Sequence, residues 1–166
     1  MLRLHIGARL VLLLAAGLSA EAGGEPLRRD FHFQTIGSDQ GLAQNSVNAI
    51  VQDHAGFLWV GTQAGLQRYD GYAFRTFEQS ADDPATEEGP VSALAEDADG
   101  VIWIGTGGNI ARLDTTRSAI ERVPDAAGAL ADHLAVRALA IDPGHGLWVG
   151  TDAGLTHIDA RGERIE

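Results

Sequence analysis

Short apolar runs separated by Asp and Gly residues occupy most of the chain after residue 46. Residues 47–51 and 57–60 are two such runs, and the turn signal Asp-His-Ala-Gly lies between them. A Gly-Thr-x-x-Gly segment at residues 61–65 leads into a third run, and residues 72–77 form a fourth. Runs of this length, bounded by Asp and Gly, are typical of β-strands joined by tight turns. We therefore expect an antiparallel all-β fold.

The same unit occurs three times, beginning at Val47, Val91 and Val136. The tryptophans of the first and second copies are 44 positions apart and those of the second and third are 45 apart, so insertions fall between copies. Four strands in about 45 residues is the content of one β-propeller blade. We predict about three antiparallel four-stranded blades, which is an incomplete ring because propellers close with about four to eight.

These repeats divide the chain into consecutive parts. We expect a signal peptide at residues 1–22, a lead-in at 23–46, blades at 47–90 and 91–135, and an incomplete third blade at 136–166. Within the lead-in, Phe31, Phe33 and Ile36 resemble the outer strand at residues 72–77, so they form a candidate ring-closing strand. Open blade faces expose apolar surface, and the isolated chain 23–166 is therefore expected to self-associate or aggregate.

The residues that recur in every copy are of types that form turns and core. An Asp ends the first strand of each copy, where its carboxylate can accept backbone N–H groups one or two residues on; these are Asp53, Asp97 and Asp142. Gly56 and Gly100 supply positive φ in the turn that follows. The third copy has His145 in that position, between two glycines, and we expect a reshaped turn there. The mid-strand tryptophans, Trp59, Trp103 and Trp148, are predicted to lie in the core on equivalent inner strands.

The amino terminus has the pattern of a secretory signal. Arg3 and Arg9 make a positive n-region, residues 10–18 are a short apolar stretch, and Ala20-Glu-Ala22 fits a small-x-small cleavage site. Nine apolar residues are too few to span about 30 Å of hydrocarbon. We expect cleavage after Ala22 and a periplasmic location.

Composition narrows the possible partners. The net charge is −11, and every basic residue other than His is Arg, so nucleic acid and anionic lipid are disfavoured. The chain has no Cys, which removes disulfides and thiolate metal sites.

Three segments, residues 35–42, 53–62 and 65–71, carry a family resemblance. They read Thr-Ile-Gly-Ser-Asp-Gln-Gly-Leu, Asp-x-x-Gly-Phe-Leu-Trp-Val-Gly-Thr and Gly-Leu-x-Arg-Tyr-Asp-Gly, and they resemble the two-component regulator propeller family. The resemblance covers about residues 31–159 and implies a periplasmic propeller that senses a ligand, often carbohydrate-related. In that family the blades precede a further β-domain, a transmembrane helix and a cytoplasmic histidine kinase or diguanylate cyclase, which these residues lack.

The resemblance leads to a function and an alternative. We expect an extracytoplasmic, non-catalytic ligand-sensing segment of a transmembrane signalling protein, with further blades of the same protein and a small or carbohydrate-related ligand as partners. The alternative is a fragment of a secreted propeller lyase or hydrolase, in which His or acidic residues should converge on one end of the strands. We assign no catalytic, cofactor or metal residues, and the ligand-binding residues are not identified by the sequence.

Several candidate sites are better explained as structure. Asp97-Ala-Asp99-Gly100 resembles a calcium loop, but the twelfth position is Gly108 rather than Glu. Residues 105–109 resemble a phosphate loop but lack its Lys. The acidic stretch Asp82, Asp83, Glu87 and Glu88 is predicted to be a solvated loop between blades. The histidines show no metal-ligand spacing; they are His5, His32, His54, His133, His145 and His157.

One repeated position is basic in all three copies: Arg68, Arg112 and His157. These residues could ring a central ligand pocket or pair with neighbouring carboxylates. We favour pairing, because isolated surface ion pairs are common and need no function.

Overall fold

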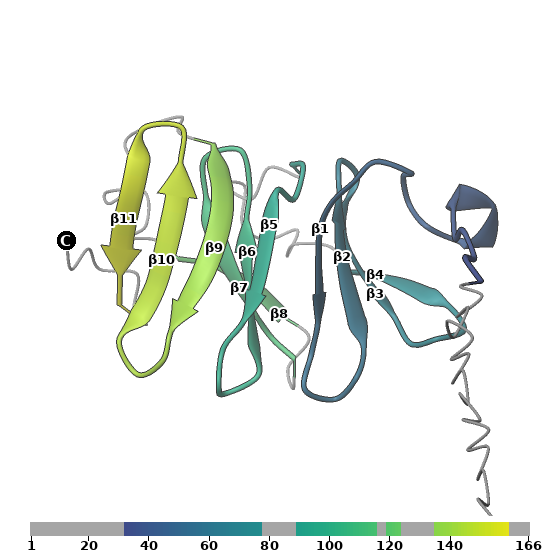
Figure 1. Cartoon of the computed structure of the whole chain (residues 1–166), viewed down its shortest axis with the longest axis horizontal. Helices are drawn as coiled ribbons and strands as arrows, with labels where there is room; N and C mark the ends of the chain where they lie inside the picture. The colour runs from purple at the N-terminus through teal and green to yellow at the C-terminus, as the bar shows by residue number, and fades with distance from the viewer. Residues whose placement is uncertain (1–31, 78–88, 116–118, 124–134, 160–166) are drawn as a thin grey trace, which may run out of the picture. The chain divides into compact units, whose positions relative to one another are not determined.

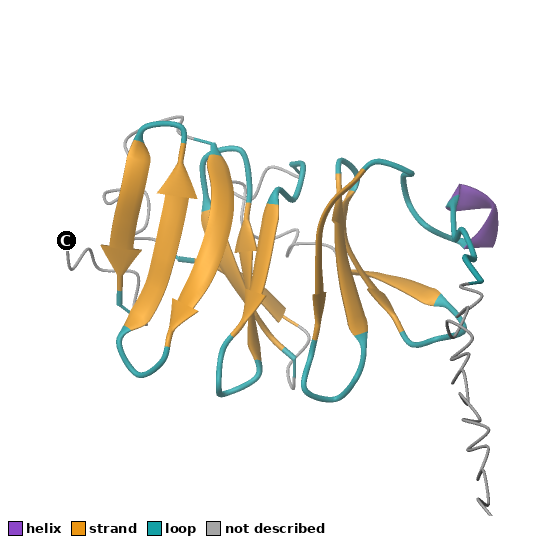
Figure 2. Ribbon diagram, viewed as in Figure 1, coloured by secondary structure: helices purple, strands orange, loops and turns teal. Residues whose placement is uncertain are grey.

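Residues 32–77, 89–115, 119–123 and 135–159 are described by a computed structural model of the chain, and they form three antiparallel sheets (Figure 1). The first sheet consists of β1 (Val47–Gln52), β2 (Leu58–Thr62), β3 (Gly65–Tyr69) and β4 (Phe74–Phe77). The second consists of β5 (Ala93–Glu96), β6 (Val101–Gly105), β7 (Ile110–Asp114) and β8 (Ala119–Arg122). The third consists of β9 (Val136–Asp142), β10 (Gly146–Thr151) and β11 (Gly154–Ile158). Apart from one 3₁₀ turn at Ser38–Gln40, the elements within the described residues are strands (Figure 2).

Each sheet is a meander in which neighbouring strands along the chain pair with one another. The register is the same in all three sheets, because the tryptophan of the second strand always pairs with the repeated basic residue of the third. These pairs are Trp59 with Arg68, Trp103 with Arg112, and Trp148 with His157. The predicted all-β blade repeat is confirmed, with the tryptophans on equivalent strands.

The first strands of the three sheets, β1, β5 and β9, lie side by side (Figure 1). Two hydrophobic cores fill the spaces between successive sheets. The core between blades one and two contains Trp59, Leu66, Phe77, Val91, Ile102, Ile104, Ala111, Leu113 and Ile120. The core between blades two and three contains Ala93, Trp103, Ile110, Val123, Val136, Leu147, Val149 and Ile158.

A repeated contact holds each sheet against the next. The backbone N–H of Val91 donates to Thr62 O across 3.0 Å, and that of Val136 donates to Thr106 O across 3.1 Å. Each valine side chain rests on the glycine that precedes the threonine. A β-carbon at Gly105 would lie 2.5 Å from Val136 Cγ1, and one at Gly61 would collide with Val91 in the same way. The glycine of the repeated Gly-Thr pair is therefore required by close approach of the next blade.

The prediction that all three tryptophans lie in the core is wrong for Trp148. Trp59 and Trp103 are buried because the next sheet covers them, whereas Trp148 is half-buried. Its face of β10 has no further sheet against it among the described residues. The strand that carries the tryptophan has the same register in each blade. The difference in burial of the tryptophans therefore comes from the sheet that packs against that strand.

Several predictions fall on parts of the chain outside the described residues. The signal peptide, Phe31, the acidic stretch Asp82, Asp83, Glu87 and Glu88, and the end of the third blade beyond residue 159 belong to this group. Residues 32–37 are described and form no strand, and Phe33 is 93% exposed. The ring-closing role of this segment stays a prediction.

Candidate functional site

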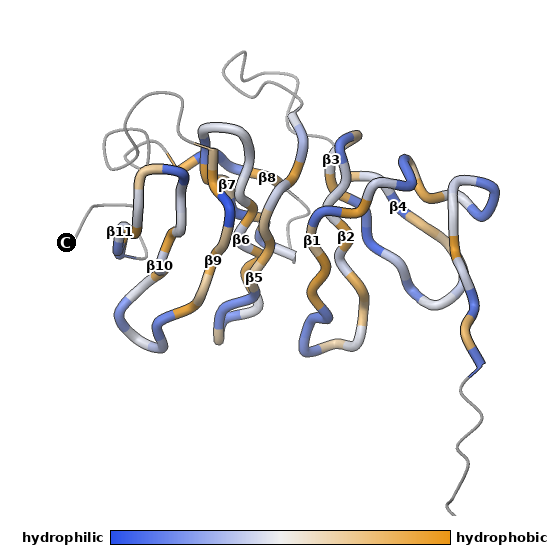
Figure 3. Tube along the Cα trace, turned by 45° about the horizontal axis from the view of Figure 1, so that its top comes forward, coloured by the Kyte–Doolittle hydropathy of each residue, from blue (hydrophilic) through white to orange (hydrophobic). Residues whose placement is uncertain are grey.

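Polar residues gather in the turns that join the first and second strands of each sheet, where Figure 3 shows blue segments below apolar strands. In the first blade, Asp53 Oδ1 accepts the backbone N–H of Phe57 at 2.8 Å. In the second, Asp97 Oδ1 accepts the N–H groups of Asp99 at 3.0 Å and Val101 at 2.9 Å. The predicted role of the Asp in holding the turn is confirmed. Its carboxylate accepts backbone N–H groups two and four residues further along the chain, rather than one or two.

The second oxygen of the same carboxylate has a partner that the sequence analysis missed. Trp59 Nε1 donates to Asp53 Oδ2 at 2.7 Å, and Trp103 Nε1 donates to Asp97 Oδ2 at 2.9 Å. The constant six-residue spacing between Asp and Trp was the available signal. Because buried indole N–H groups need an acceptor, this bond fixes the tryptophan ring beneath the turn.

The third blade departs from this arrangement. Trp148 stacks on His157 with ring centroids 4.2 Å apart, and Asp142 lies near two histidines instead of an indole. Asp142 Oδ2 is 3.2 Å from His157 Nε2, and Oδ1 is 3.6 Å from His145 Nδ1. The reshaped turn predicted at His145 is confirmed, because positive φ moves to Gly144 and Gly146, on either side of it.

A cleft of about 760 Å³ lies between the turns of the second and third blades. The second blade contributes Glu96–Asp99 and Trp103, and the third contributes Ile141–Gly146 and Asp159. A smaller hollow of about 270 Å³ shares Asp97, Asp99 and Trp103, and adds Arg112 and Glu121. A concave site of several hundred Å³ is the size that small-molecule ligands occupy.

The equivalent place between the first and second blades is bridged by an ion pair. His54 Nδ1 lies 2.6 Å from Glu96 Oε1, and the backbone N–H of His54 donates to both oxygens of Glu96, at 3.1 and 2.9 Å. The Glu96 hydrogen bond and charge raise the pKa of His54. At the next interface the matching positions are Ala98 and Ile141, which cannot make this bridge, and both line the cleft.

The lining of the cleft is rich in carboxylates. Asp97, Asp99, Asp142 and Asp159 bring carboxylates and His145 brings an imidazole, whereas Trp103 is 4% exposed and contributes little surface. Such a site disfavours anionic ligands and suits hydroxyl-rich or cationic ones, because carboxylates accept hydrogen bonds from several hydroxyl groups.

The repeated basic residues lie on the third strand of each sheet, and the tryptophan strand separates them from the first strands β1, β5 and β9. They therefore do not ring a pocket at those first strands. Arg112 pairs with Glu121 at 3.3 Å, as the pairing hypothesis expects. The guanidinium of Arg68 instead lies 4.3 Å from the centroid of the Phe57 ring.

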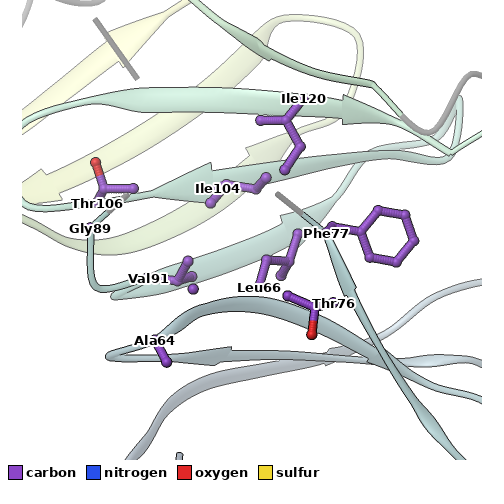
Figure 4. A pocket seen from close by; sticks show the side chains of 10 residues that line it. Ala64, Leu66, Thr76, Phe77, Gly89, Val91, Ile104, Thr106 and Ile120 are labelled. Carbon is purple, nitrogen blue, oxygen red and sulfur yellow. The ribbon is translucent and has the colours of Figure 1, made fainter. Parts of the chain in front are cut away.

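A gap of about 130 Å³ lies between blades one and two at the opposite end, near the Gly-Thr turns (Figure 4). Figure 4 shows the apolar side chains of Leu66, Val91, Ile104 and Ile120 around it, with Phe77 at one side. Its volume is small and its lining is mainly apolar, so it is a weaker candidate than the acidic cleft.

The structure also bears on the candidate phosphate loop and on possible metal sites. Thr106 N–H and Oγ1 both donate to Asn109 O, at 3.0 and 3.2 Å, so the segment resembling a phosphate loop is a turn between β6 and β7. Across the described ranges, no group of three or more His, Asp or Glu side chains is arranged to hold a metal ion.

Comparisons with known proteins agree with this architecture. The profile of the family described as two-component regulator propeller matches residues 41–64 and 87–108. Histidine kinase P4 of Formosa agariphila is 37% identical over 82 residues, which is 48% of this chain and 6% of the kinase. The chain therefore spans a small part of that relative.

Three solved structures with a similar fold are extracellular domains of one-component or hybrid two-component systems. That of a hybrid two-component system from B. thetaiotaomicron aligns with a TM-score of 0.66 and 29% identity, over 79% of this chain and 19% of that chain. That of a one-component system from the same organism aligns with a TM-score of 0.59 and 27% identity, over 70% of this chain and 15% of that chain. The profile match covers the first two copies, and the third copy shares their register, so the repeat of this chain is similar to the two-component regulator propeller repeat.

Proposed function

We propose that this chain is the extracytoplasmic ligand-sensing part of a transmembrane signalling protein and has no catalytic activity of its own. The observation that carries the proposal is its repeat, which is similar to the repeat of a sensor family whose similar structures are extracellular domains of signalling systems. The histidine kinase relative supports a phosphorelay output elsewhere in the full protein.

An exported amino terminus is part of this proposal. Residues 1–22 have the signal-peptide pattern of two arginines, a short apolar stretch and Ala-Glu-Ala. No helix long and apolar enough to cross a bilayer occurs within the residues that the structure covers. Fusion of residues 1–30 to a reporter active only outside the cytoplasm should give signal, and replacement of Leu12, Leu13 and Leu14 by Asp should abolish it. A silent wild-type fusion would refute export.

The cleft between the second and third blades is the proposed ligand site. Its carboxylates can accept hydrogen bonds from sugar hydroxyls. The ligand class that fits this chemistry is a neutral carbohydrate or another hydroxyl-rich molecule rather than an anionic one.

Thermal unfolding with a panel of oligosaccharides tests the site. Neutral cello-, xylo- and malto-oligosaccharides are the probes, and oligogalacturonate is the anionic control. Asp99 is exposed, and its backbone rather than its side chain is hydrogen-bonded to Asp97, so Asp99→Asn should retain the fold and lose the ligand-induced rise in Tm. Asp39→Asn changes the same charge on an exposed residue outside the cleft and should keep the rise. Equal rises in both variants would remove the cleft from the proposal.

The proposed absence of catalytic activity can be tested separately. Acidic residues and His145 do meet at one end of the strands, which the alternative lyase or hydrolase requires. However, Asp53, Asp97 and Asp142 occupy one position of the repeat, and the first two hold backbone and indole groups. Prolonged incubation with the same oligosaccharides should leave their chain lengths unchanged. Shortened or unsaturated products that depend on Asp142 or His145 would favour the enzyme.

A further inference from the structure

The two joints between successive blades have equivalent positions that carry different side chains. At the joint between blades one and two, the backbone N–H of His54 donates to both carboxylate oxygens of Glu96, at 3.1 and 2.9 Å. At the joint between blades two and three, the same two positions are Ala98 and Ile141. Both joints lie between sheets that this chain itself contains, and the second joint forms the cleft.

The first joint shows which chemical group fits the N–H of the turn. Glu96 reaches across from the neighbouring blade and gives that N–H an oxygen acceptor. Ala98 is exposed in the cleft, and within the described residues its N–H has no hydrogen-bond partner. Ile141 cannot supply an acceptor, because its side chain has no oxygen. An oxygen of a ligand in the cleft can therefore take the place that the Glu96 carboxylate has at the first joint.

The rest of the cleft lining decides which kind of oxygen fits. Asp99 and Asp142 would repel an additional carboxylate, so the acceptor is neutral. Ile141 is half-buried against the core between blades two and three and presents apolar surface to the cleft. The cleft thus combines a backbone N–H donor, carboxylate acceptors and an apolar side chain.

We infer that the cleft selects a sugar that carries an acetamido group, an inference that rests on the proposed ligand site and names its ligand class. The acetamido carbonyl accepts the N–H of Ala98, as Glu96 accepts that of His54 at the first joint. The acetamido N–H donates to a carboxylate of the cleft, and the methyl group packs on Ile141. A hydroxyl group at the same sugar position has no methyl group for Ile141, so it binds more weakly.

A matched pair of ligands tests the ligand class. Triacetylchitotriose has acetamido groups where cellotriose has hydroxyl groups, and the two trisaccharides are otherwise the same. Isothermal titration calorimetry with the purified chain should give a Kd about tenfold lower for triacetylchitotriose, because the cellotriose hydroxyl leaves part of the site unfilled. Deacetylated chitotriose separates recognition of the acetamido group from attraction of a cation to the carboxylates. It should bind more weakly than triacetylchitotriose.

Proline at position 98 removes the N–H while keeping a residue that this turn accepts. The third blade has Pro143 at the same position, and its turn still closes with a backbone hydrogen bond from His145 N–H to Asp142 O at 2.9 Å. Ala98→Pro should therefore fold and lose the preference for triacetylchitotriose, whereas added bulk alone would weaken binding of both trisaccharides. Gln63→Pro, in an exposed turn outside the cleft, is the matched control and should keep the preference. Circular dichroism checks the fold of both variants.

The outcomes separate this inference from the proposed function. Equal affinities for the two trisaccharides, both lost in Asp99→Asn, would overturn acetamido selection and leave the ligand site in place. A preference for triacetylchitotriose that a folded Ala98→Pro variant retains would also overturn the inference. Absence of binding by every oligosaccharide would overturn both the inference and the proposed ligand site.

Discussion

Trp103 donates its indole N–H to Asp97 Oδ2 across 2.9 Å, and the carboxylate that accepts it also accepts two backbone N–H groups of the turn above. Trp59 and Asp53 form the same pair at 2.7 Å. One carboxylate thus couples the end of the first strand to the centre of the second. In the third blade, Asp142 lies beside His157 and His145, and the indole of Trp148 stacks on His157 instead.

Removal of the first of these carboxylates should destabilise the chain. Asp53→Ala leaves the indole N–H of the buried Trp59 without its acceptor, which costs about 1–3 kcal/mol of unfolding free energy. Urea unfolding monitored by tryptophan fluorescence measures this loss. Asp152→Ala, which removes a carboxylate from an exposed pair with Arg137, should change the free energy little. Equal effects of the two substitutions would contradict the role of the indole bond.

Close approach of successive blades should make the internal glycines intolerant of a side chain. Gly105→Ala brings a β-carbon to 2.5 Å from Val136 Cγ1, and relief of this overlap costs about 1–3 kcal/mol. Gly150→Ala, at the same position of the third blade, should leave the unfolding free energy of the monomer unchanged. Denaturant unfolding at low protein concentration compares the two, and a Gly105→Ala variant as stable as Gly150→Ala would show that the blades are not in close contact.

The His54–Glu96 pair between blades one and two should make stability depend on pH. Hydrogen bonding to Glu96 raises the pKa of His54 above its usual 6.5, so protonated His54 is favoured in the folded state. This stabilisation is fully present below the unfolded pKa and is lost as pH rises through the folded pKa. Wild-type Tm should therefore fall more than that of Glu96→Gln as pH rises from about 6 to 9, across the neutral range in which His titrates. Parallel Tm profiles in that window would exclude the pair as a source of stability.

The blade repeat was predictable because its cause is local. Asp, Gly and Trp recur at fixed spacing within each copy, and that spacing sets turn position and strand register regardless of what lies nearby. The fourth run was also identified, although β4 begins at Phe74 and Tyr72 lies exposed in the preceding turn. The constant spacing was also the available signal for the Asp-to-Trp hydrogen bond of the first two blades, although the third blade keeps the spacing and places His157 beside Asp142 instead.

Features that depend on neighbouring blades were not predictable from one copy of the repeat. The exposure of Trp148 follows from what covers β10, which its own sequence does not encode. The cleft exists where Ala98 and Ile141 replace the bridging pair His54 and Glu96. Recognition of that difference requires knowing that the first turn of one blade meets the inner strand of the next, which only the three-dimensional arrangement supplies.

The ligand site can be tested most directly with the three indole N–H signals of a ¹⁵N-labelled chain, each assigned by a Trp→Phe variant. Trp103 packs in the core between blades two and three, and its indole N–H is bonded to Asp97 beside the cleft, whereas Trp59 packs in the core between blades one and two, away from it. Titration with the neutral oligosaccharide that gives the largest rise in Tm should shift the Trp103 signal saturably and leave that of Trp59 in place. A Trp103 signal that stays fixed at saturating oligosaccharide, or a Trp59 signal that moves equally, would contradict ligand binding in the cleft between the second and third blades.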